Sequence, residues 1–592
     1  MTPEQEYQRR GVTWQARSES YARLDAQLSQ ARGAVALLAV ILGYFTFGSW
    51  WFGVGLGVPV TVFIGLVIWH ERNARRQQLA QRAMRHCEFG SARLHGTWQG
   101  KGNAGEAYRD AEHPYADDLD VFGAGSLFEL VSTARSQPGE ARLAQWLLTP
   151  ANEAEVLARQ EAVRDLAPRL DLREEMALLG DDVRAGIHAE KLAAWGSSAR
   201  VEMFAGARWL MLVLALMSGA AFVGWLAQLW PLLWFFGVML VVMPLSMFLR
   251  PAIARMIEHL DARARDLSLI AALLGRLESE KFGSARLLAL QTELSANGLT
   301  ASEQIHRLRK LIDWLEGDLN AFFALPAFCL LWRPQFSFAI ERWRRQAGPH
   351  LGRWVEVLAE MEALASLAAF AYEHPSAVYP ELASGGRVFA AQALAHPLIP
   401  EQRAVANDLE FGEAPRLLIV SGSNMSGKST LLRAVGLNAA LAWAGAPVCA
   451  RSLRISPFTI GASLRANDSL LEGRSRFYAE IRRLRQVVDL AGGERPLLFL
   501  IDEVLSGTNS HDRRIGAEAI LKGLLERGAC GLTTTHDLAL TRIPEVLAGQ
   551  ALNVHFQDEM VDGQLHFDYR LRPGVVERSN ALDLMRSIGL KV

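Results

Sequence analysis

Two long apolar runs dominate the hydrophobic pattern of the chain, and neither contains a charged residue. They cover residues 33–69 and 209–249. About 20 apolar residues cross a bilayer, so each run is long enough for two helices joined by a tight turn. The turns are expected near Gly48–Trp51 and Gln228–Pro231, because tryptophan favours the membrane interface. The pattern therefore predicts two membrane hairpins with four transmembrane helices.

Two other interpretations of these runs are weaker. Buried core helices of a soluble protein seldom extend this far without a charge. A cleaved signal peptide would have a much shorter apolar region, and a shorter polar segment would precede it.

Arginines flank both hairpins on their outer sides, while the predicted turns carry no charge. The flanking residues are Arg9, Arg10, Arg17, Arg23, Arg32, Arg72, Arg75, Arg76, Arg82, Arg85, Arg208, Arg250 and Arg255. The positive-inside rule then places all soluble parts in the cytoplasm. Four scattered cysteines without a CxxC pair agree with a reducing compartment. We expect a multi-pass protein of the cell (inner) membrane.

The other parts of the 592-residue chain predict several domains, and the net charge of −1 gives no global signal for binding a polyanion. Apolar positions show helical spacing on both sides of the second hairpin, with a break predicted at Pro138–Gly139 and an N-cap at Asn152. Near the C-terminus, short β-rich runs alternate with helices, which is typical of an α/β domain. The predicted parts are an N-terminal segment (1–32), hairpin one (33–70), a first helical part (71–200), hairpin two (201–250), a second helical part (251–375) and an α/β domain (376–592).

The stretch "LLIVSGSNMSGKSTLLRAV" reads as a buried strand, a glycine-rich turn and the start of a helix. Its central residues fit GxxxxGK[ST], the motif whose backbone N–H groups bind the phosphates of a nucleoside triphosphate. Lys428 is expected to reach the β- and γ-phosphates, and Ser429 to bind Mg²⁺. The predicted cofactor-binding residues of this loop are Gly422, Ser423, Asn424, Met425, Ser426, Gly427, Lys428, Ser429 and Thr430.

Two further strands end in residues suited to hydrolysis of that nucleotide. "PLLFLIDEV" ends with Asp502, which can hold Mg²⁺, and Glu503, which can polarise the attacking water. "LTTTHDLAL" contains His536, which we interpret as a sensor of the γ-phosphate, although a lone histidine is more often structural. The loop "GTNSHD" is either a plain loop or a segment that meets a second subunit. The predicted catalytic residues are Glu503, His536 and Lys428, and the predicted metal ligands are Ser429 and Asp502.

In this order, "SGSNMSGKST", "LIDEVLSGTNSHD" and "TTTHD" resemble the ATPase domain of the MutS family, within the ABC ATPase class. "ANDSLLEGRSRFYAEIRRL" is similar to the family's signature region, with Arg476 where the family has threonine. The resemblance implies ATP and Mg²⁺ as ligands, and a homodimer in which Ser475 of one subunit faces the nucleotide held by the other. It extends to residues 119–200 and 355–592, which are similar to the family's core, lever and ATPase regions.

The chain departs from the family in several places. MutS mismatch repair proteins begin with a domain whose Phe-x-Glu wedge enters DNA, whereas the Phe-x-Glu here, Phe411–Glu413, lies just before the P-loop strand. The second hairpin interrupts the lever region. Ala404 stands where the family has an aromatic residue that stacks on adenine, so adenine selectivity stays open. After Val592 we expect no further dimerisation or nuclease domain.

A stretch rich in arginine and tryptophan, residues 332–354, has three interpretations. Its side chains can contact nucleic acid, lie at lipid headgroups, or form a solvated helix face. The residues concerned are Arg342, Trp343, Arg344, Arg345, Arg353 and Trp354.

The predicted fold is multidomain, with α-helical membrane hairpins, a helical lever and core region, and a C-terminal α/β P-loop ATPase domain. The predicted function is that of a membrane-anchored ATPase that hydrolyses ATP in a dimeric sandwich and transmits the motion through its lever helices, with any DNA binding not specific for mismatches. Three alternatives stay open: an ABC-transporter-like ATPase subunit, a scaffold that binds ATP without useful turnover, and a genuine mismatch repair or recombination protein. The sequence names no other protein partner.

Overall fold

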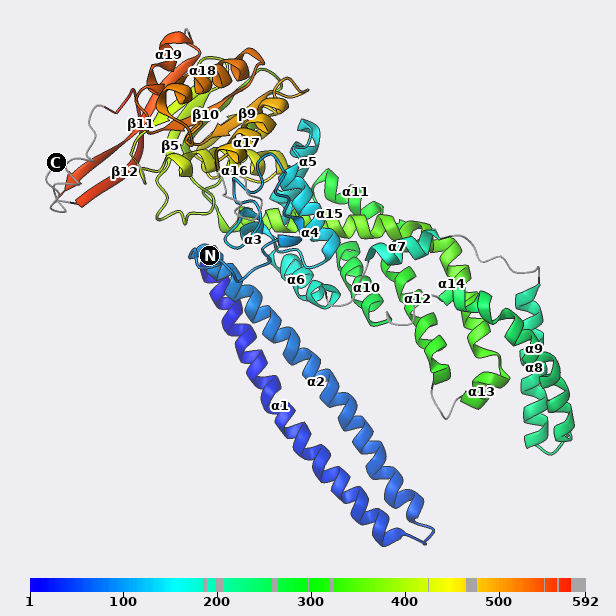
Figure 1. The fold of residues 1–592 in the computed structure, drawn as a ribbon. Helices are drawn as coiled ribbons and strands as arrows, with labels where there is room; N and C mark the ends of the chain where they lie inside the picture. The colour runs from blue at the N-terminus through cyan, green and yellow to red at the C-terminus, as the bar shows by residue number, and fades with distance from the viewer. Residues whose placement is uncertain are drawn as a thin grey trace. The chain divides into compact units, whose positions relative to one another are not determined.

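The computed structural model describes residues 1–184, 189–198, 206–257, 264–296, 298–319, 324–423, 425–464, 476–547, 549–561 and 564–576. The chain divides into two compact units. Unit 1 contains residues 1–132, 147–156 and 369–592, and unit 2 contains residues 133–146 and 157–368. Figure 1 shows that most of the chain is helical and that the large sheets lie in its C-terminal part, which confirms the coarse fold prediction.

The helices of the described part run in chain order. They are α1 (Pro3–Thr46), α2 (Phe52–Leu94), α3 (Leu127–Val131), α4 (Gln137–Leu148), α5 (Glu153–Leu166), α6 (Leu170–Arg184), α7 (Ala189–Ser197), α8 (Ala207–Leu226), α9 (Leu232–Ile257), α10 (Ala264–Ser279), α11 (Ala285–Thr292), α12 (Ala301–Leu315), α13 (Ala324–Cys329), α14 (Trp332–Ala347), α15 (Leu351–Glu373), α16 (Lys428–Ala444), α17 (Arg476–Leu490), α18 (Ser510–Glu526) and α19 (Ile543–Val546).

The strands fall into three sheets. They are β1 (Ser295–Ala296), β2 (Leu299–Thr300), β3 (Glu381–Leu382), β4 (Phe389–Leu394), β5 (Asn407–Phe411), β6 (Leu417–Ser421), β7 (Ser452–Ile455), β8 (Thr459–Ser463), β9 (Leu497–Ile501), β10 (Cys530–Thr535), β11 (Ala551–Val561) and β12 (Gln564–Pro573). A two-stranded sheet pairs β1 with β2, and a four-stranded sheet has the order β3-β7-β4-β5. The largest sheet has six strands in the order β12-β11-β6-β10-β9-β8.

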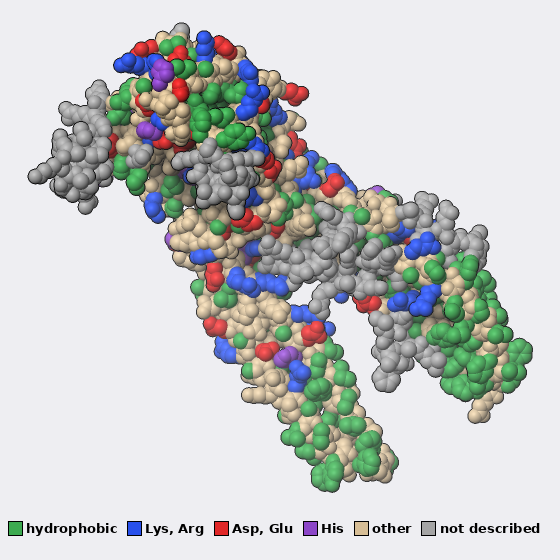
Figure 2. Space-filling view, in the orientation of Figure 1, with side chains coloured by type: hydrophobic (Ala, Val, Ile, Leu, Met, Phe, Trp, Pro, Cys, Tyr) green, Lys and Arg blue, Asp and Glu red, His purple; other side chains and the backbone are tan. Residues whose placement is uncertain are grey.

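In unit 1, α1 and α2 form a long hairpin. Thr2 begins α1 with a capping box, because its side chain accepts from the N–H of Gln5 while the Gln5 side chain accepts from the N–H of Thr2. The turn lies at residues 47–51, where the tryptophans predict it. Near this turn, apolar side chains face outward, with Val40 70% and Phe45 78% exposed. Figure 2 shows them as a green surface at one end of the hairpin, which is unfavourable in water.

In unit 2, α8 and α9 form a second, shorter hairpin whose turn also lies where the sequence predicts it, at residues 227–231. It is held by an apolar cluster that includes Met211, Val242 and Leu249 from the hairpin and Leu331 from the segment before α14. Four helices of the described chain are long and apolar enough to cross a membrane, by length and composition. They are Pro3–Thr46, Phe52–Leu94, Ala207–Leu226 and Leu232–Met256. The short α13 is not among them, because its six residues are too few to cross a bilayer.

A buried ion pair attaches the first hairpin to the last turn of α15. Arg93 of α2 donates to both oxygens of Glu373, over 2.6 Å from Nε to Oε2 and 2.5 Å from Nη2 to Oε1. The Tyr7 hydroxyl donates to Glu373 Oε1 at 2.7 Å, and both charged side chains are only 1% exposed. Gly90 allows this approach, because a Cβ there would lie 2.6 Å from the Tyr7 ring. The hairpin is therefore joined to the helix that leads directly into the C-terminal sheets.

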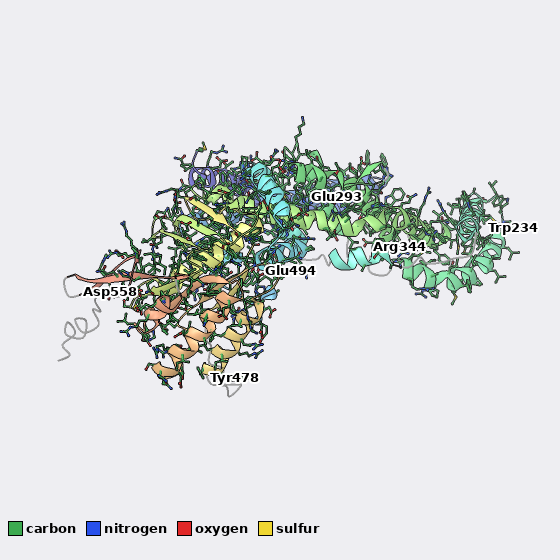
Figure 3. The ribbon with its side chains drawn as sticks, turned by 90° about the horizontal axis from the view of Figure 1, so that it is seen from above. Trp234, Glu293, Arg344, Tyr478, Glu494 and Asp558 are labelled. Atoms are coloured by element: carbon green, nitrogen blue, oxygen red, sulfur yellow. The ribbon has the colours of Figure 1, made fainter. Side chains whose placement is uncertain are left out.

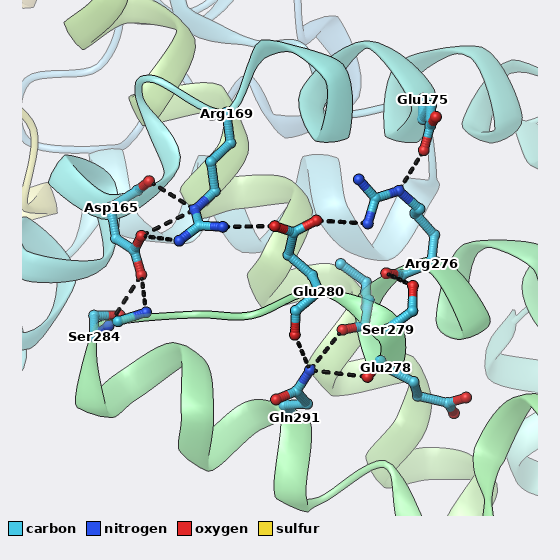
Figure 4. Close-up of polar contacts among 11 residues, drawn as sticks. Asp165, Arg169, Glu175, Arg276, Glu278, Ser279, Glu280, Ser284 and Gln291 are labelled. Atoms are coloured by element: carbon cyan, nitrogen blue, oxygen red, sulfur yellow. Dashed lines mark hydrogen bonds and ion pairs between the residues drawn. The ribbon is translucent and has the colours of Figure 1, made fainter.

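Unit 2 contains a chain of ion pairs that links α5, α6 and α10 (Figure 4). Arg169 lies 2.6 Å from both Asp165 and Glu280, and Arg276 contacts Glu280 at 2.6 Å and Glu175. All of these side chains are partly exposed, so each pair contributes little to stability on its own. Together they connect the end of α5, the start of α6 and the end of α10.

One predicted helix boundary is wrong. The sequence predicts a break at Pro138–Gly139, but the break lies earlier, between α3 and α4, and Pro138 is in the first turn of α4. A proline is favourable there because the first N–H groups of a helix have no intrahelical partner. Ser136 begins the helix by accepting from the N–H of Gly139 at 3.1 Å. The predicted N-cap at Asn152 is confirmed, since its side chain accepts from the N–H of Glu155 at 2.8 Å.

Candidate ATP-binding and hydrolysis site

Three neighbouring parallel strands bring the predicted motifs to one edge of the six-stranded sheet. β10 lies between β6 and β9 and runs parallel to both. Its register pairs Thr535 with Ser421, the last residue of β6, and Thr533 with Ile501, the last residue of β9. Every residue of these three strands is buried, as expected for strands covered on both faces. The glycine-rich loop, the acidic pair and His536 therefore leave the sheet side by side.

The loop after β6 needs its two glycines. Gly422 and Gly427 have φ of 152° and 102°, which few other residues adopt. A Cβ at Gly422 would lie 2.8 Å from Ser426 Oγ and 3.1 Å from the carbonyl oxygen of Phe556. Met425 has a φ of 69° and points outward with 83% of its surface exposed. Asn424 lies outside the described residues.

Lys428 begins α16, and its ammonium group lies inside the loop. Nζ donates to the carbonyl oxygens of Gly422 and Ser423, both at 2.8 Å. Burial lowers its pKa, while Glu503 and Asp502 act in the opposite direction. The Oγ atoms of Ser423 and Ser426 are buried and have no hydrogen-bond partner among the described residues. A buried cation beside unpartnered hydroxyls and backbone that only glycine fits has the chemistry of a phosphate site.

Asp502 is held by hydroxyl groups from two elements. Ser429 Oγ, on α16, donates to Asp502 Oδ2 at 2.5 Å, and the Thr534 hydroxyl, on β10, donates to Oδ1. The oxygens of Asp502 and Ser429 are hard ligands of the kind that Mg²⁺ prefers, so this pair fits the metal that the sequence predicts. Sequence reasoning missed the role of Thr534, because "TTTHD" indicates only the end of a strand and does not single out one of its threonines.

Glu503 and His536 lie together at the mouth of the site. His536 Nδ1 is 3.1 Å from Glu503 Oε1, and the two side chains are 48% and 32% exposed. The N–H of Glu503 donates to Thr534 Oγ1 at 3.0 Å, so one hydroxyl contacts both acidic residues. Glu503 has a φ of 52°, a conformation that is strained for a residue with a side chain. The predicted base is therefore held in a fixed direction by its surroundings.

The loop that follows the acidic pair is attached to two helices. Arg513 of α18 donates to the carbonyl oxygens of Leu505, Ser506 and Thr508 at 3.1, 2.9 and 3.1 Å. Glu480 of α17 accepts from the N–H of Ser506 at 3.1 Å. Part of the predicted contact loop "GTNSHD" has a local structural role, because Asn509 caps α18 by accepting from the N–H of Asp512 at 2.9 Å.

A pocket of about 530 Å³ opens beside the loop and contains an aromatic residue that sequence reasoning missed. Ala404 lines it, and so does Tyr569 of β12. A Cβ at Gly427 would lie 3.2 Å from the Tyr569 ring, so the ring lies against the P-loop. Asn407 fixes this part of β12, donating to the Tyr569 carbonyl at 3.0 Å and accepting from the N–H of Leu571 at 2.7 Å. No local motif marks Tyr569, which reaches the pocket only because β12 folds back along β11.

The segment between α2 and α3 lies against both helices that flank the site. Asp118 accepts from Arg483 of α17 at 2.6 Å and from the N–H of Leu464 at 2.7 Å. Asp120 lies 3.6 Å from Arg433 of α16. Leu464 lies two residues before the predicted signature region (466–484), in which Ser475 lies outside the described residues. The part of the chain similar to the family's core therefore contacts the P-loop helix and α17, the helix in which the predicted signature region ends.

Comparison with known proteins gives this region a family. The family model of MutS domain V matches residues 418–591. The chain is 38% identical over 197 residues to "Endonuclease MutS2" of Thermus thermophilus, which covers 33% of this chain and 25% of that protein. It is 32% identical over 254 residues to "DNA mismatch repair protein MutS 2" of Halobacterium salinarum, and this similarity covers 41% of this chain and 28% of that protein. The chain thus spans about a quarter of the length of the curated relatives it matches.

The matched region begins inside β6 and contains the P-loop, both acidic residues, His536 and Tyr569. The order and geometry of these groups agree with the ATP and Mg²⁺ chemistry general to such proteins. Residues 418–591 of the chain thus match MutS domain V, and this part of the chain is similar to the curated MutS2 proteins.

Proposed function

We propose that the chain is a membrane-anchored ATPase that hydrolyses ATP with Mg²⁺ at this edge of the six-stranded sheet. The observation that carries the proposal is the unbroken line of contacts from Ser429 through Asp502 and Thr534 to Glu503 and His536. It joins a metal-binding pair to a base through one shared hydroxyl. A scaffold that only bound the nucleotide would not need this alignment.

Each residue of the site then has a role. Ser429 and Asp502 would hold Mg²⁺, which neutralises phosphate charge when bound. Glu503 accepts the proton of the attacking water, and His536, with its proton on Nδ1, keeps the carboxylate oriented. Lys428 exchanges its two carbonyl contacts for phosphate oxygens. The Tyr569 ring offers a flat face on which the adenine of ATP can stack, which Ala404 cannot provide.

The site would be completed by a second copy of the chain. The family resemblance assigns Ser475 to the nucleotide of the partner. Exposed apolar side chains follow the site's motifs along the chain, with Tyr478 56%, Ile515 52% and Leu538 56% exposed. A second ATPase domain would cover such residues, which are unfavourable in water. ATP binding should therefore favour the dimer, and hydrolysis should release it.

The membrane would be reached through the first hairpin. The Arg93–Glu373 pair ties α2 to the end of α15, and Asp118 ties the following segment to the helices beside the nucleotide. Both contacts lie within unit 1. Movement of the ATPase domain on ATP binding would thus be passed to the hairpin by buried, directional contacts rather than by loose packing.

DNA is a second candidate ligand, favoured by the names of the relatives, which include a mismatch repair protein and an endonuclease. We propose that any DNA binding by this chain is directed to phosphates, weakens steeply with salt and does not distinguish mispairs. Competition between a matched duplex and one with a single G·T mispair tests this. A tenfold preference for the mispair, about 1.4 kcal/mol, would contradict it.

Replacement of the base tests the ATPase assignment. Glu503→Gln should keep ATP binding and slow hydrolysis by roughly 10²-fold or more, since a positioned base is lost. Glu494→Gln is the matched control, because Glu494 is an exposed residue of the same domain, labelled in Figure 3. Turnover by Glu503→Gln at the rate of the control would overturn the assignment.

The same variant tests the shared site. Glu503→Gln should form a dimer when ATP is added and should not form one without ATP.

Reporter fusions test the topology. Fusions at Glu88, Gly180 and Val592 should all report the cytoplasm, because the flanking arginines place these positions on one side. A reporter signal from the opposite side of the membrane at any of the three would refute the two-hairpin arrangement.

A further inference from the structure

A basic cavity of about 720 Å³ lies in unit 2, between α12 and α14 and beside the first residues of α8. Four cationic side chains line it: Arg208 from α8, Arg307 and Lys310 from α12, and Arg342 from α14. No acidic residue is among the described residues that form its walls. Trp343 fixes the two helices, because its Nε1–H donates to the carbonyl oxygen of Gln304 at 2.8 Å.

Among the described residues, the four cations of the cavity differ from their neighbours because no carboxylate forms an ion pair with them. In the ranges that the structure describes, no carboxylate lies within 4 Å of any of the four. Nearby arginines that do not line the cavity are neutralised: Arg309 lies 3.6 Å from Asp313, Arg345 3.2 Å from Glu341, and Arg353 2.7 Å from Glu356. Like charges gathered in one concavity repel each other and attract an anion. Of the arginines in the stretch 332–354, which the sequence leaves with three interpretations, Arg345 and Arg353 are thus paired, whereas Arg342 lines the cavity.

The rim of the cavity has the composition of a membrane interface. Arg208 is the second residue of α8, and the next residue, Trp209, is 68% exposed. Trp314 lines the cavity with 59% of its surface exposed, and its ring stacks on Trp332 with centroids 6.2 Å apart. Figure 2 shows blue side chains next to the green surface of the second hairpin, and Figure 3 labels Arg344 in α14 and Trp234 near the far end of that hairpin. Tryptophan and arginine both favour the level of lipid headgroups.

We propose that this cavity binds the phosphate-bearing headgroup of an anionic phospholipid. The proposal rests on the membrane insertion of the second hairpin proposed above. A lipid fits better than a nucleic acid, since the cavity adjoins an apolar hairpin along which the acyl chains can lie. The cationic groups bind the phosphate, and the exposed tryptophans lie at the level where headgroup and chain meet.

Native mass spectrometry of the full chain in a non-ionic detergent tests the site, with phosphatidylglycerol and phosphatidylcholine as probes. The wild type should retain phosphatidylglycerol with about tenfold preference or more, as expected for several cations around one phosphate. The variant Arg307→Gln/Lys310→Gln/Arg342→Gln should lose that preference. The control Arg345→Gln removes an arginine of α14, the helix of Arg342, that is paired with Glu341. This variant should keep the preference for phosphatidylglycerol. Equal retention of both lipids by the wild type, or equal loss in both variants, would overturn the proposal.

Two competitors distinguish other sources of phosphate. Inorganic phosphate at millimolar concentration should not displace the lipid, and displacement would assign the site to a free anion. A short oligonucleotide should bind no better to the wild type than to the triple variant. Oligonucleotide binding that the triple variant loses would assign the cavity to nucleic acid instead.

Alkaline extraction of membranes separates this proposal from the one on which it rests. Both the wild type and the triple variant should stay in the membrane, because the substitutions lie outside the hairpins. Release of the wild type would refute membrane anchoring itself. Retention of both proteins without any preference for phosphatidylglycerol would refute only the headgroup site.

Discussion

The two hairpins are held in opposite ways. The first is fixed in unit 1 by Arg93, Glu373 and Tyr7, in a buried joint of charged and polar groups. The second is fixed in unit 2 by an apolar cluster around Met211 and Leu331. Apolar contacts are non-directional, whereas a bidentate arginine–carboxylate pair requires one relative orientation of the two side chains. In the function proposed above, the first hairpin would therefore follow the ATPase domain, and the second would serve as an anchor.

The buried ion pair should give the largest effect. Arg93→Ala leaves Glu373 buried without its partner and should destabilise unit 1 by about 3–5 kcal/mol. Thermal unfolding and limited proteolysis in detergent measure this, and Arg76→Ala, an exposed arginine of the same helix, is the control. The double variant Arg93→Met/Glu373→Leu should recover most of the stability. Its apolar contact would no longer fix the orientation of α2 against α15. If Arg93→Ala proves as stable as the control, the joint is not what holds the hairpin.

The apolar joint should respond less. Leu331→Ala removes a side chain that is only 4% exposed and should cost about 2–4 kcal/mol. Leu288→Ala is the control, since that leucine is 42% exposed. Stability in detergent should fall while the rate of ATP hydrolysis stays unchanged. A matching fall in hydrolysis would show that the second hairpin is coupled to the ATPase domain after all.

The two units should also differ in their response to pH. Burial raises the pKa of Glu362, on α15 in unit 2, to about 7, although hydrogen bonds from Ser136 and the N–H of Arg135 lower it. The folded state holds this proton more tightly than the unfolded state, so its contribution is complete below the ordinary value of 4.5 and is lost as the pH rises through about 7.

Glu362→Gln should remove that loss. The variant should match the wild type near pH 5 and exceed it by about 1–2 kcal/mol at pH 8. Chemical unfolding at the two pH values, followed by a probe in unit 2, measures the difference. The same dependence in both proteins would mean that another group titrates.

The smallest effect should come from a change that leaves both joints intact. Tyr569→Ala removes the aromatic face of the pocket and should raise the KM for ATP about fivefold, as expected for the loss of one stacking contact. Tyr569→Phe should retain wild-type affinity. Because neither joint is altered, the change should be the same in detergent and in reconstituted membranes. A change in KM that differs between detergent and membranes would show that Tyr569 is coupled to the hairpins.

Local motifs made much of the nucleotide site predictable. The strand before Gly422 and the strands before Asp502 and His536 are short apolar runs, and their parallel order brings the three ends to one edge. The hairpin turns were predictable because each uncharged run is about twice the length of one apolar helix that could cross a bilayer. Contacts between distant segments were not, since they depend on the finished fold. Thr534, Tyr569 and the Arg93–Glu373 pair, 280 residues apart, belong to this class.

Leu505 shows how the stiffness of the catalytic loop can be altered without touching its chemistry. It has a φ of 55°, which costs about 1–2 kcal/mol for a residue with a side chain. Its side chain is 7% exposed and packs against Gly516, where a Cβ would lie only 2.5 Å from it. Burial of a leucine side chain stabilises the fold by about 1.5–3 kcal/mol. The two contributions nearly balance, so glycine at 505, which has no Cβ, would relax the backbone and free the loop at little net cost in stability. Position 505 is thus a place where the stiffness of the loop after Glu503 can be changed by substitution while the fold is preserved.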